Sequence, residues 1–103
     1  MTREELLKHH ETLCNEAREL MKRKNHDYAG EGGMEPFANF TRTEAMGVCS
    51  TEQGFLVRVV DKISRLSTFT SAGKLEVEGE GFHDSVVDII NYMVLFSGYL
   101  KDK

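Results

Sequence analysis

Apolar residues recur at three- and four-residue steps in three long stretches of the chain, a spacing typical of amphipathic helices. The stretches run from about Thr2 to Lys24, from about Ser50 to Phe69 and from about Phe82 to Leu100. No convincing alternation of apolar and polar residues indicates a strand. We therefore predict an all-α fold, in which three main helices form a bundle within a single domain over residues 1–103.

Two helix starts carry the three-residue spacing of a capping box. Thr2 is followed by Glu5, and Ser50 is followed by Gln53. In this motif the first side chain and the third helical residue satisfy each other's backbone N–H groups. The spacing therefore predicts that the first two helices begin at these residues.

The segment from Asn25 to Cys49 contains four glycines and the single proline of the chain. We expect it to be mostly irregular, with a short helix between Ala38 and Met46. A long irregular segment is uncommon in a small domain unless it has a function, so we expect it to cover a ligand.

The second helix has two opposite faces on a helical wheel. The apolar face consists of Phe55, Leu56, Val59, Val60, Ile63 and Leu66, and the opposite face of Arg58, Asp61, Lys62 and Arg65. Arginine and lysine at this spacing are suited to phosphate groups. The alternative is a solvated face with one i, i+4 ion pair.

The third helix is apolar over most of its surface, which predicts a central position in the bundle. Asp84, Asp88 and Asn91 nevertheless share one stripe of it. A buried carboxylate requires a cation, a hydrogen-bond donor or a metal. Asp84 is alternatively a helix-start residue, and Asp88 an ion-pair partner of the second helix, through Arg58, Lys62 or Arg65.

Composition narrows the class of protein. The chain has 103 residues, a mass of 11.7 kDa and a net charge of −4, which argues against a duplex-DNA binder. No apolar run approaches the roughly 20 residues that span a bilayer, so we expect no membrane partner. Two cysteines without CxxC spacing favour a cytoplasmic location. A short chain buries a thin core, which favours a homo-oligomer.

Four segments, KNHDYAG, FANF, RVVDKISRL and DSVVDIINYMVL, follow one another between about Lys22 and Leu100. Together they resemble the phage and bacterial nucleotide modification associated domain 1 family, which is related to the MazG-like all-α nucleoside-triphosphate pyrophosphohydrolases. The resemblance implies a dimeric or larger protein of nucleotide metabolism, in the host cytoplasm if a phage encodes it. It also implies a nucleotide ligand and Mg²⁺-dependent cleavage between the α- and β-phosphates.

The resemblance also suggests which residues hold the metal. The related enzymes use two acidic helical motifs, and Asp84 and Asp88 stand where the second one falls. In the first motif Asp61 is the only acid, because Lys62 and Arg65 replace the expected carboxylates. We expect Asp61, Asp84 and Asp88 to hold Mg²⁺, with Asp84 and Asp88 as the catalytic pair.

The expected ligand site combines cations, aromatic rings and amides. Arg58, Lys62 and Arg65 are expected to bind phosphate, and Tyr28, Phe37, Phe40 and Tyr92 to stack on a base, with Asn39 or Asn91 at its polar edge. Lys24 and Asp27 complete the loop side of the pocket. Phe37 and Phe40 have the alternative role of anchoring the loop on the bundle.

Three functions remain open from the sequence. The first is a nucleotide-handling protein that acts as a Mg²⁺-dependent pyrophosphohydrolase on a nucleoside triphosphate or a modified one. The second is a non-catalytic binder that sequesters a signalling nucleotide used in host defence. The replacement of acids by bases on the second helix favours this binder. The third is a protein-interaction module.

Overall fold

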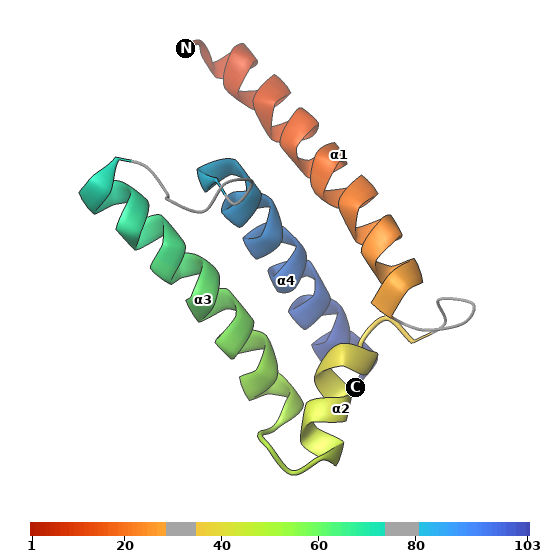
Figure 1. Ribbon diagram of the computed structural model, residues 1–103. Coiled ribbons are helices and arrows are strands. Elements are labelled where there is room, and N and C mark those ends of the chain that lie inside the picture. The colour runs from red at the N-terminus through yellow and green to blue at the C-terminus, as the bar shows by residue number, and fades with distance from the viewer. Residues whose placement is uncertain (29–34, 74–80) are drawn as a thin grey trace.

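The computed structural model describes residues 1–28, 35–73 and 81–103, with the backbone alone for residues 25–28. Within these residues it contains four helices and no strand, which confirms the predicted all-α fold (Figure 1). The helices are α1 (Arg3–Tyr28), α2 (Ala38–Ala45), α3 (Thr51–Ala72) and α4 (Phe82–Asp102). None of these helices is both long and apolar enough to cross a membrane.

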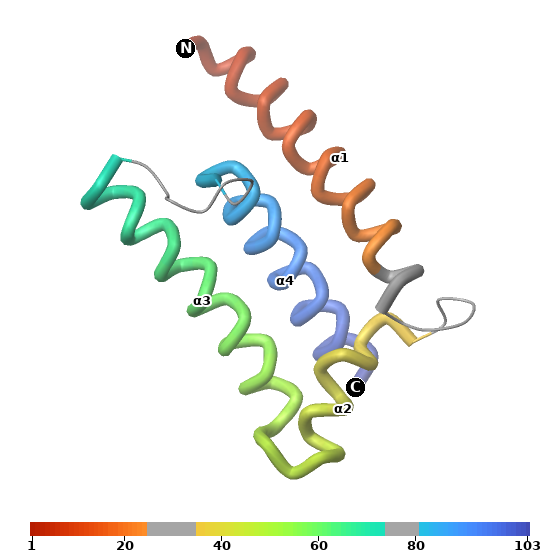
Figure 2. The backbone as a smooth tube through the Cα atoms, in the orientation of Figure 1, coloured from red at the N-terminus to blue at the C-terminus, as the bar shows by residue number. Residues whose placement is uncertain are grey.

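The three long helices lie side by side, with α4 between α1 and α3 (Figures 1 and 2). The chain runs in opposite directions along α3 and α4. The short helix α2 lies where α3 begins and α4 ends, and the start of α1 projects beyond the other helices. The molecule measures 45 × 29 × 24 Å, so it is clearly elongated.

The helix ends agree closely with the predicted capping signals. The N–H of Gln53 donates to Ser50 Oγ at 3.1 Å, and the N–H of Ser50 donates to Gln53 Oε1 at 3.0 Å. The N–H of Glu5 donates to Thr2 Oγ1 at 3.1 Å. At its other end, α3 stops at Gly73, whose φ of +77° is readily adopted only by glycine.

A cluster of aromatic rings joins α2 to the α3–α4 pair. The fully buried ring of Phe55 stacks on Phe40 with centroids 4.0 Å apart and on Phe96 with centroids 5.0 Å apart. The ring of Phe37 contacts Tyr99 edge-on at 5.7 Å. Phe37 and Phe40 therefore anchor the α2 segment on the bundle, which confirms the alternative role predicted for them.

The contact between α1 and α4 is centred on one buried hydrogen bond. Ala17 is almost completely buried, and its carbonyl oxygen accepts from Asn91 Nδ2 at 2.9 Å. Asn91 is 8% exposed, so its amide lies largely in the interior. Near the start of α4, His83 Nε2 lies 2.8 Å from Glu16 Oε2. The Asn91 hydrogen bond and the contact between His83 and Glu16 therefore both link α1 to α4.

The orientation of α3 differs from the one that its apolar face suggests. Leu56, Val60 and Ile63 are each more than half exposed, although they belong to that face. The side chains of Lys62 and Arg65, on the opposite face, are only 19% and 30% exposed. Lys62 and Arg65 are therefore turned toward the molecule, whereas Leu56, Val60 and Ile63 of the apolar face are turned to solvent.

Candidate functional site

Two adjoining pockets lie between α1, α3 and α4. The narrower one, of about 70 Å³, also reaches α2 and is lined by Met21, Lys24, Pro36, Asn39, Phe40, Arg58, Asp88, Asn91, Tyr92 and Leu95. The wider one, of about 390 Å³, is lined by Glu16, Leu20, Arg23, Lys24, Lys62, Arg65, Asp84, Ser85, Val87 and Asp88. Lys24 and Asp88 line both pockets, and we call the two pockets together the α4 groove.

The carboxylate of Asp88 lies at the centre of the α4 groove. Its Oδ2 is 3.1 Å from Lys62 Nζ of α3, and its Oδ1 is 3.6 Å from Lys24 Nζ of α1. The Asp88 side chain is 14% exposed, so the two lysines supply the positive charge that a largely buried carboxylate requires. The ion pair predicted between Asp88 and α3 is confirmed for Lys62, and Lys24 adds a second partner.

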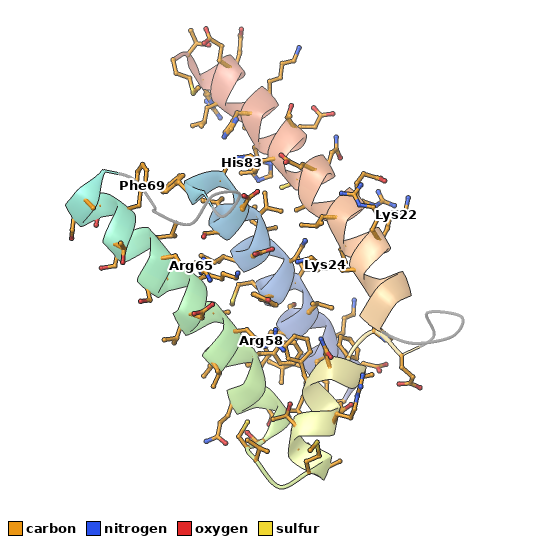
Figure 3. All side chains as sticks on the ribbon, in the orientation of Figure 1. Lys22, Lys24, Arg58, Arg65, Phe69 and His83 are labelled. Carbon is orange, nitrogen blue, oxygen red and sulfur yellow. The ribbon has the colours of Figure 1, made fainter. Side chains whose placement is uncertain are left out.

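The α4 groove has the opposite charge sign to the chain as a whole. Among the described residues, five cationic side chains line it, namely Arg23, Lys24, Arg58, Lys62 and Arg65. Three acidic side chains of the described residues line it as well, namely Glu16, Asp84 and Asp88. The formal charge of this described lining is therefore +2, in a chain whose net charge is −4. Figure 3 shows Lys24, Arg58 and Arg65 on the helices that flank α4.

The three acids predicted to hold a metal are not brought together. Asp84 and Asp88 both line the wider pocket, one turn apart. Asp61 lies outside both pockets, with a side chain that is 63% exposed and an oxygen 3.8 Å from Arg65 Nε. Within the described parts of the chain, no group of three His, Cys, Asp or Glu side chains is placed to hold a metal ion.

Asp84 also has the helix-start role that the sequence left open for it. One of its carboxylate oxygens accepts from the N–H of Gly81 at 3.3 Å. This interaction satisfies a backbone donor at the start of α4 and places a negative charge near the positive end of the helix dipole. The residue therefore stabilises the helix while it lines the wider pocket.

The predicted base-binding residues are only partly available. Asn39 and Tyr92 line the narrower pocket, but one face of Phe40 is covered by Phe55. The guanidinium carbon of Arg58 lies 6.0 Å from the centroid of the Phe40 ring, within cation–π range. The amide nitrogen of Asn91 is already bonded to α1. The predicted side chains of Asp27 and Tyr28 lie outside the described residues.

Several lining residues of α1 were not predicted. Glu16, Leu20 and Arg23 line the wider pocket together with Lys24. Their spacing of four and then three residues places them on one face of α1. Lys24 was predicted at the pocket, whereas Glu16, Leu20 and Arg23 were not. The signal that could have identified Arg23 and Glu16 is that they share one face of α1 with the apolar residue Leu20.

The chain matches no family model, and no curated protein or solved structure is significantly similar to it. The resemblance to the nucleotide modification associated domain 1 family therefore stays a prediction.

Proposed function

We propose that the α4 groove binds the phosphates of a nucleotide or a closely related phosphorylated small molecule. The observation that carries this proposal is the convergence of Lys24 and Lys62, from two different helices, on Asp88. Arg58 and Arg65 line the same groove. Cations fixed in position by the fold lose little entropy when an anion binds, which favours affinity.

The dimensions of the two pockets support a ligand that lies mainly in the wider one. Its volume of about 390 Å³ falls within the range common for small-molecule sites. Its walls carry Arg23, Lys62 and Arg65, which suit phosphate oxygens. The narrower pocket adds Asn39 and Tyr92, which offer an amide and an aromatic ring to a polar, flat group.

The binding proposal is tested by calorimetric titration without metal, using ATP, AMP and a cyclic dinucleotide as probes. Arg58→Gln removes one groove cation whose described contact is a weak cation–π interaction, so the fold should be preserved. We expect about a tenfold loss of affinity, the effect of one charge-assisted hydrogen bond. Lys101→Gln on exposed α4 surface is the matched control and should bind like the wild type. Equal affinities for all three proteins would contradict the proposal.

A second candidate function is Mg²⁺-dependent hydrolysis of the bound nucleotide. The observation that favours it is that Asp84 and Asp88 line the same wide pocket. Mg²⁺ is commonly held by one or two carboxylates together with substrate phosphates. The metal would polarise the phosphate and activate water, while the groove cations would orient the phosphate chain.

The hydrolysis candidate is tested by measuring pyrophosphate release from nucleoside triphosphates with and without Mg²⁺. Asp84→Asn is the informative variant, because asparagine still accepts the N–H of Gly81 but supplies no charge to a metal. We expect activity to fall at least tenfold in this variant. If the wild type binds nucleotide but releases no pyrophosphate, the hydrolysis candidate is contradicted. The function is then non-catalytic nucleotide binding.

A further inference from the structure

The first half of α1 carries a histidine and a cysteine on one face of the helix. Because His10 and Cys14 are four residues apart, their side chains lie one above the other on consecutive turns. Cys14 Sγ lies 3.8 Å from His10 Nδ1. Helices that bind zinc through an H-E-x-x-H motif hold their two histidines at this same spacing. The segment HETLC differs from that motif by a cysteine in place of the second histidine.

The His10–Cys14 pair lies on the side of α1 that packs on α4 further along the helix. On a helical wheel both residues lie within about 60° of Ala17, which is buried and bonded to α4. Glu16 contacts His83, the second residue of α4, and the start of α1 projects past this point (Figure 1). The side chains of the pair are exposed, so an ion from solvent can reach them.

The separation of the two ligand atoms fits a single metal ion. Zinc binds a cysteine sulfur at about 2.3 Å and a histidine nitrogen at about 2.0–2.1 Å, usually with tetrahedral angles. These values place the sulfur and the nitrogen about 3.6 Å apart. The observed distance of 3.8 Å between Cys14 Sγ and His10 Nδ1 is close to this value. The pair therefore needs little rearrangement to hold an ion.

The two ligand types select the class of ion. A thiolate sulfur and an imidazole nitrogen suit Zn²⁺ and related borderline or soft divalent cations, whereas Mg²⁺ and Ca²⁺ prefer oxygen ligands. Among the described residues, neither His10 nor Cys14 uses its side chain in another hydrogen bond or in an ion pair. Metal binding therefore displaces only the contact that the two side chains make with each other.

We propose that His10 and Cys14 bind one Zn²⁺ ion, or another divalent cation of the same class, on the surface of α1. Cys14 loses its thiol proton to water as its sulfur binds the ion, and His10 binds through Nδ1. Within the described residues, no third His, Cys, Asp or Glu side chain completes the site, so water fills the remaining positions. The proposal concerns residues outside the α4 groove and does not depend on nucleotide binding.

The bound ion also joins two consecutive turns of α1. This part of the helix projects from the bundle, and Leu6 and Leu7 are exposed on it, so it has little of the tertiary packing that keeps helices formed. His10 and Cys14 can hold one ion only while the turn between them is helical. Zn²⁺ should therefore slow hydrogen exchange of the backbone amides around Cys14.

The metal site is tested by titrating the full chain, with its cysteines reduced, with Co²⁺. This ion accepts the ligands of zinc sites and absorbs light when a thiolate binds it. We expect a thiolate-to-Co²⁺ charge-transfer band that saturates at one ion per chain. The dissociation constant should be about 1–100 µM, weaker than that of a closed site with four protein ligands. Zn²⁺ should displace Co²⁺ and abolish the band, whereas Mg²⁺ should not.

Single substitutions locate the ion. Cys14→Ser should remove the band, and His10→Ala should weaken Co²⁺ binding at least about tenfold, because one of two protein ligands is lost. His9→Ala, at the adjacent exposed histidine, is the matched control for His10→Ala. Cys49→Ser, at the other free cysteine, is the control for Cys14→Ser. Both controls should bind Co²⁺ like the wild type.

A further variant separates metal binding from a structural effect of losing the cysteine. Cys14→His should still bind Zn²⁺, measured by calorimetry, but should give no charge-transfer band with Co²⁺, because imidazole binds zinc and carries no sulfur. Both positions of the pair are exposed, so circular dichroism should show unchanged helicity in every metal-free variant. The proposal would be overturned by a wild type without the band, by a band that survives Cys14→Ser, or by equal affinities for His10→Ala and His9→Ala.

Discussion

Lys62 of α3 and Asp88 of α4 form the shortest Lys–Asp contact at the α4 groove, with Nζ 3.1 Å from Oδ2. Their side chains are 19% and 14% exposed, so both are largely removed from water. Lys24 of α1 approaches the other carboxylate oxygen at 3.6 Å. The Asp88 carboxylate therefore links α1, α3 and α4 through ion pairs. Its negative charge also lowers the positive charge that the α4 groove offers to a ligand.

Asp88→Asn separates these two roles. The substitution leaves two lysines without their carboxylate, and we expect the free energy of unfolding to fall by about 1–2 kcal/mol, less than for a fully buried pair. The affinity for a metal-free nucleotide should rise, because a negative charge leaves the groove. Urea denaturation and calorimetric titration measure the two effects. Asp102→Asn on exposed α4 surface is the control and should change neither quantity.

Asn91→Ala tests whether the asparagine holds α1 on α4. The substitution removes the donor to the carbonyl oxygen of Ala17 and leaves that buried acceptor without its partner. We expect a loss of about 1–3 kcal/mol in the free energy of unfolding. Asn15→Ala, at an exposed position of α1, should cost far less. Equal denaturation midpoints for the two variants would show that the hydrogen bond contributes little.

The helices and their ends could be predicted from the sequence because they depend on local signals. The pair Ser50 and Gln53 forms a capping box wherever its surroundings allow, and Gly73 ends α3 through its own backbone preference. The short α2 helix also lies close to its predicted position between Ala38 and Met46. The convergence of cations on Asp88 followed from the cost of burying a carboxylate.

The orientation of α3 could not be predicted in the same way. A helical wheel identifies the apolar face of Leu56 and Val60 but does not say whether the chain itself or a partner covers it. The position of Phe55 decides which side of α3 is buried, because its ring is enclosed by Phe40 and Phe96 from other helices. Such long-range packing leaves no local signal in the sequence. The same packing places Asp61 outside the pocket that Asp84 and Asp88 line.

Phe55 and Leu56 are neighbours on α3 that test this orientation directly. Phe55→Ala should lower the free energy of unfolding by about 3–5 kcal/mol, because its ring is fully buried in the core. Leu56→Ala should cost less than about 1 kcal/mol, because the Leu56 side chain is 51% exposed. Urea denaturation of the two variants measures both losses. Similar losses for the two variants would contradict this orientation of α3.

Gly73→Ala tests the C-terminal end of α3. Its φ of +77° disfavours a side chain, although the space around it is open. We expect a loss of about 1 kcal/mol from backbone strain alone. Ser71→Ala is the matched control, because Ser71 is an exposed position in the last turn of α3 and alanine is the better helix former. Thermal unfolding of the two variants should therefore differ, with Ser71→Ala unchanged or slightly more stable.

The most direct test of nucleotide binding is a two-dimensional ¹H–¹⁵N NMR titration of the wild-type protein with ATP, AMP and a cyclic dinucleotide, without metal. We predict that at least one probe shifts the backbone signals of Lys24, Lys62 and Asp88, while those of Thr12 and Lys101 stay in place. No shift with any probe, or shifts confined to residues outside the α4 groove, would contradict the assignment of the groove as a phosphate site.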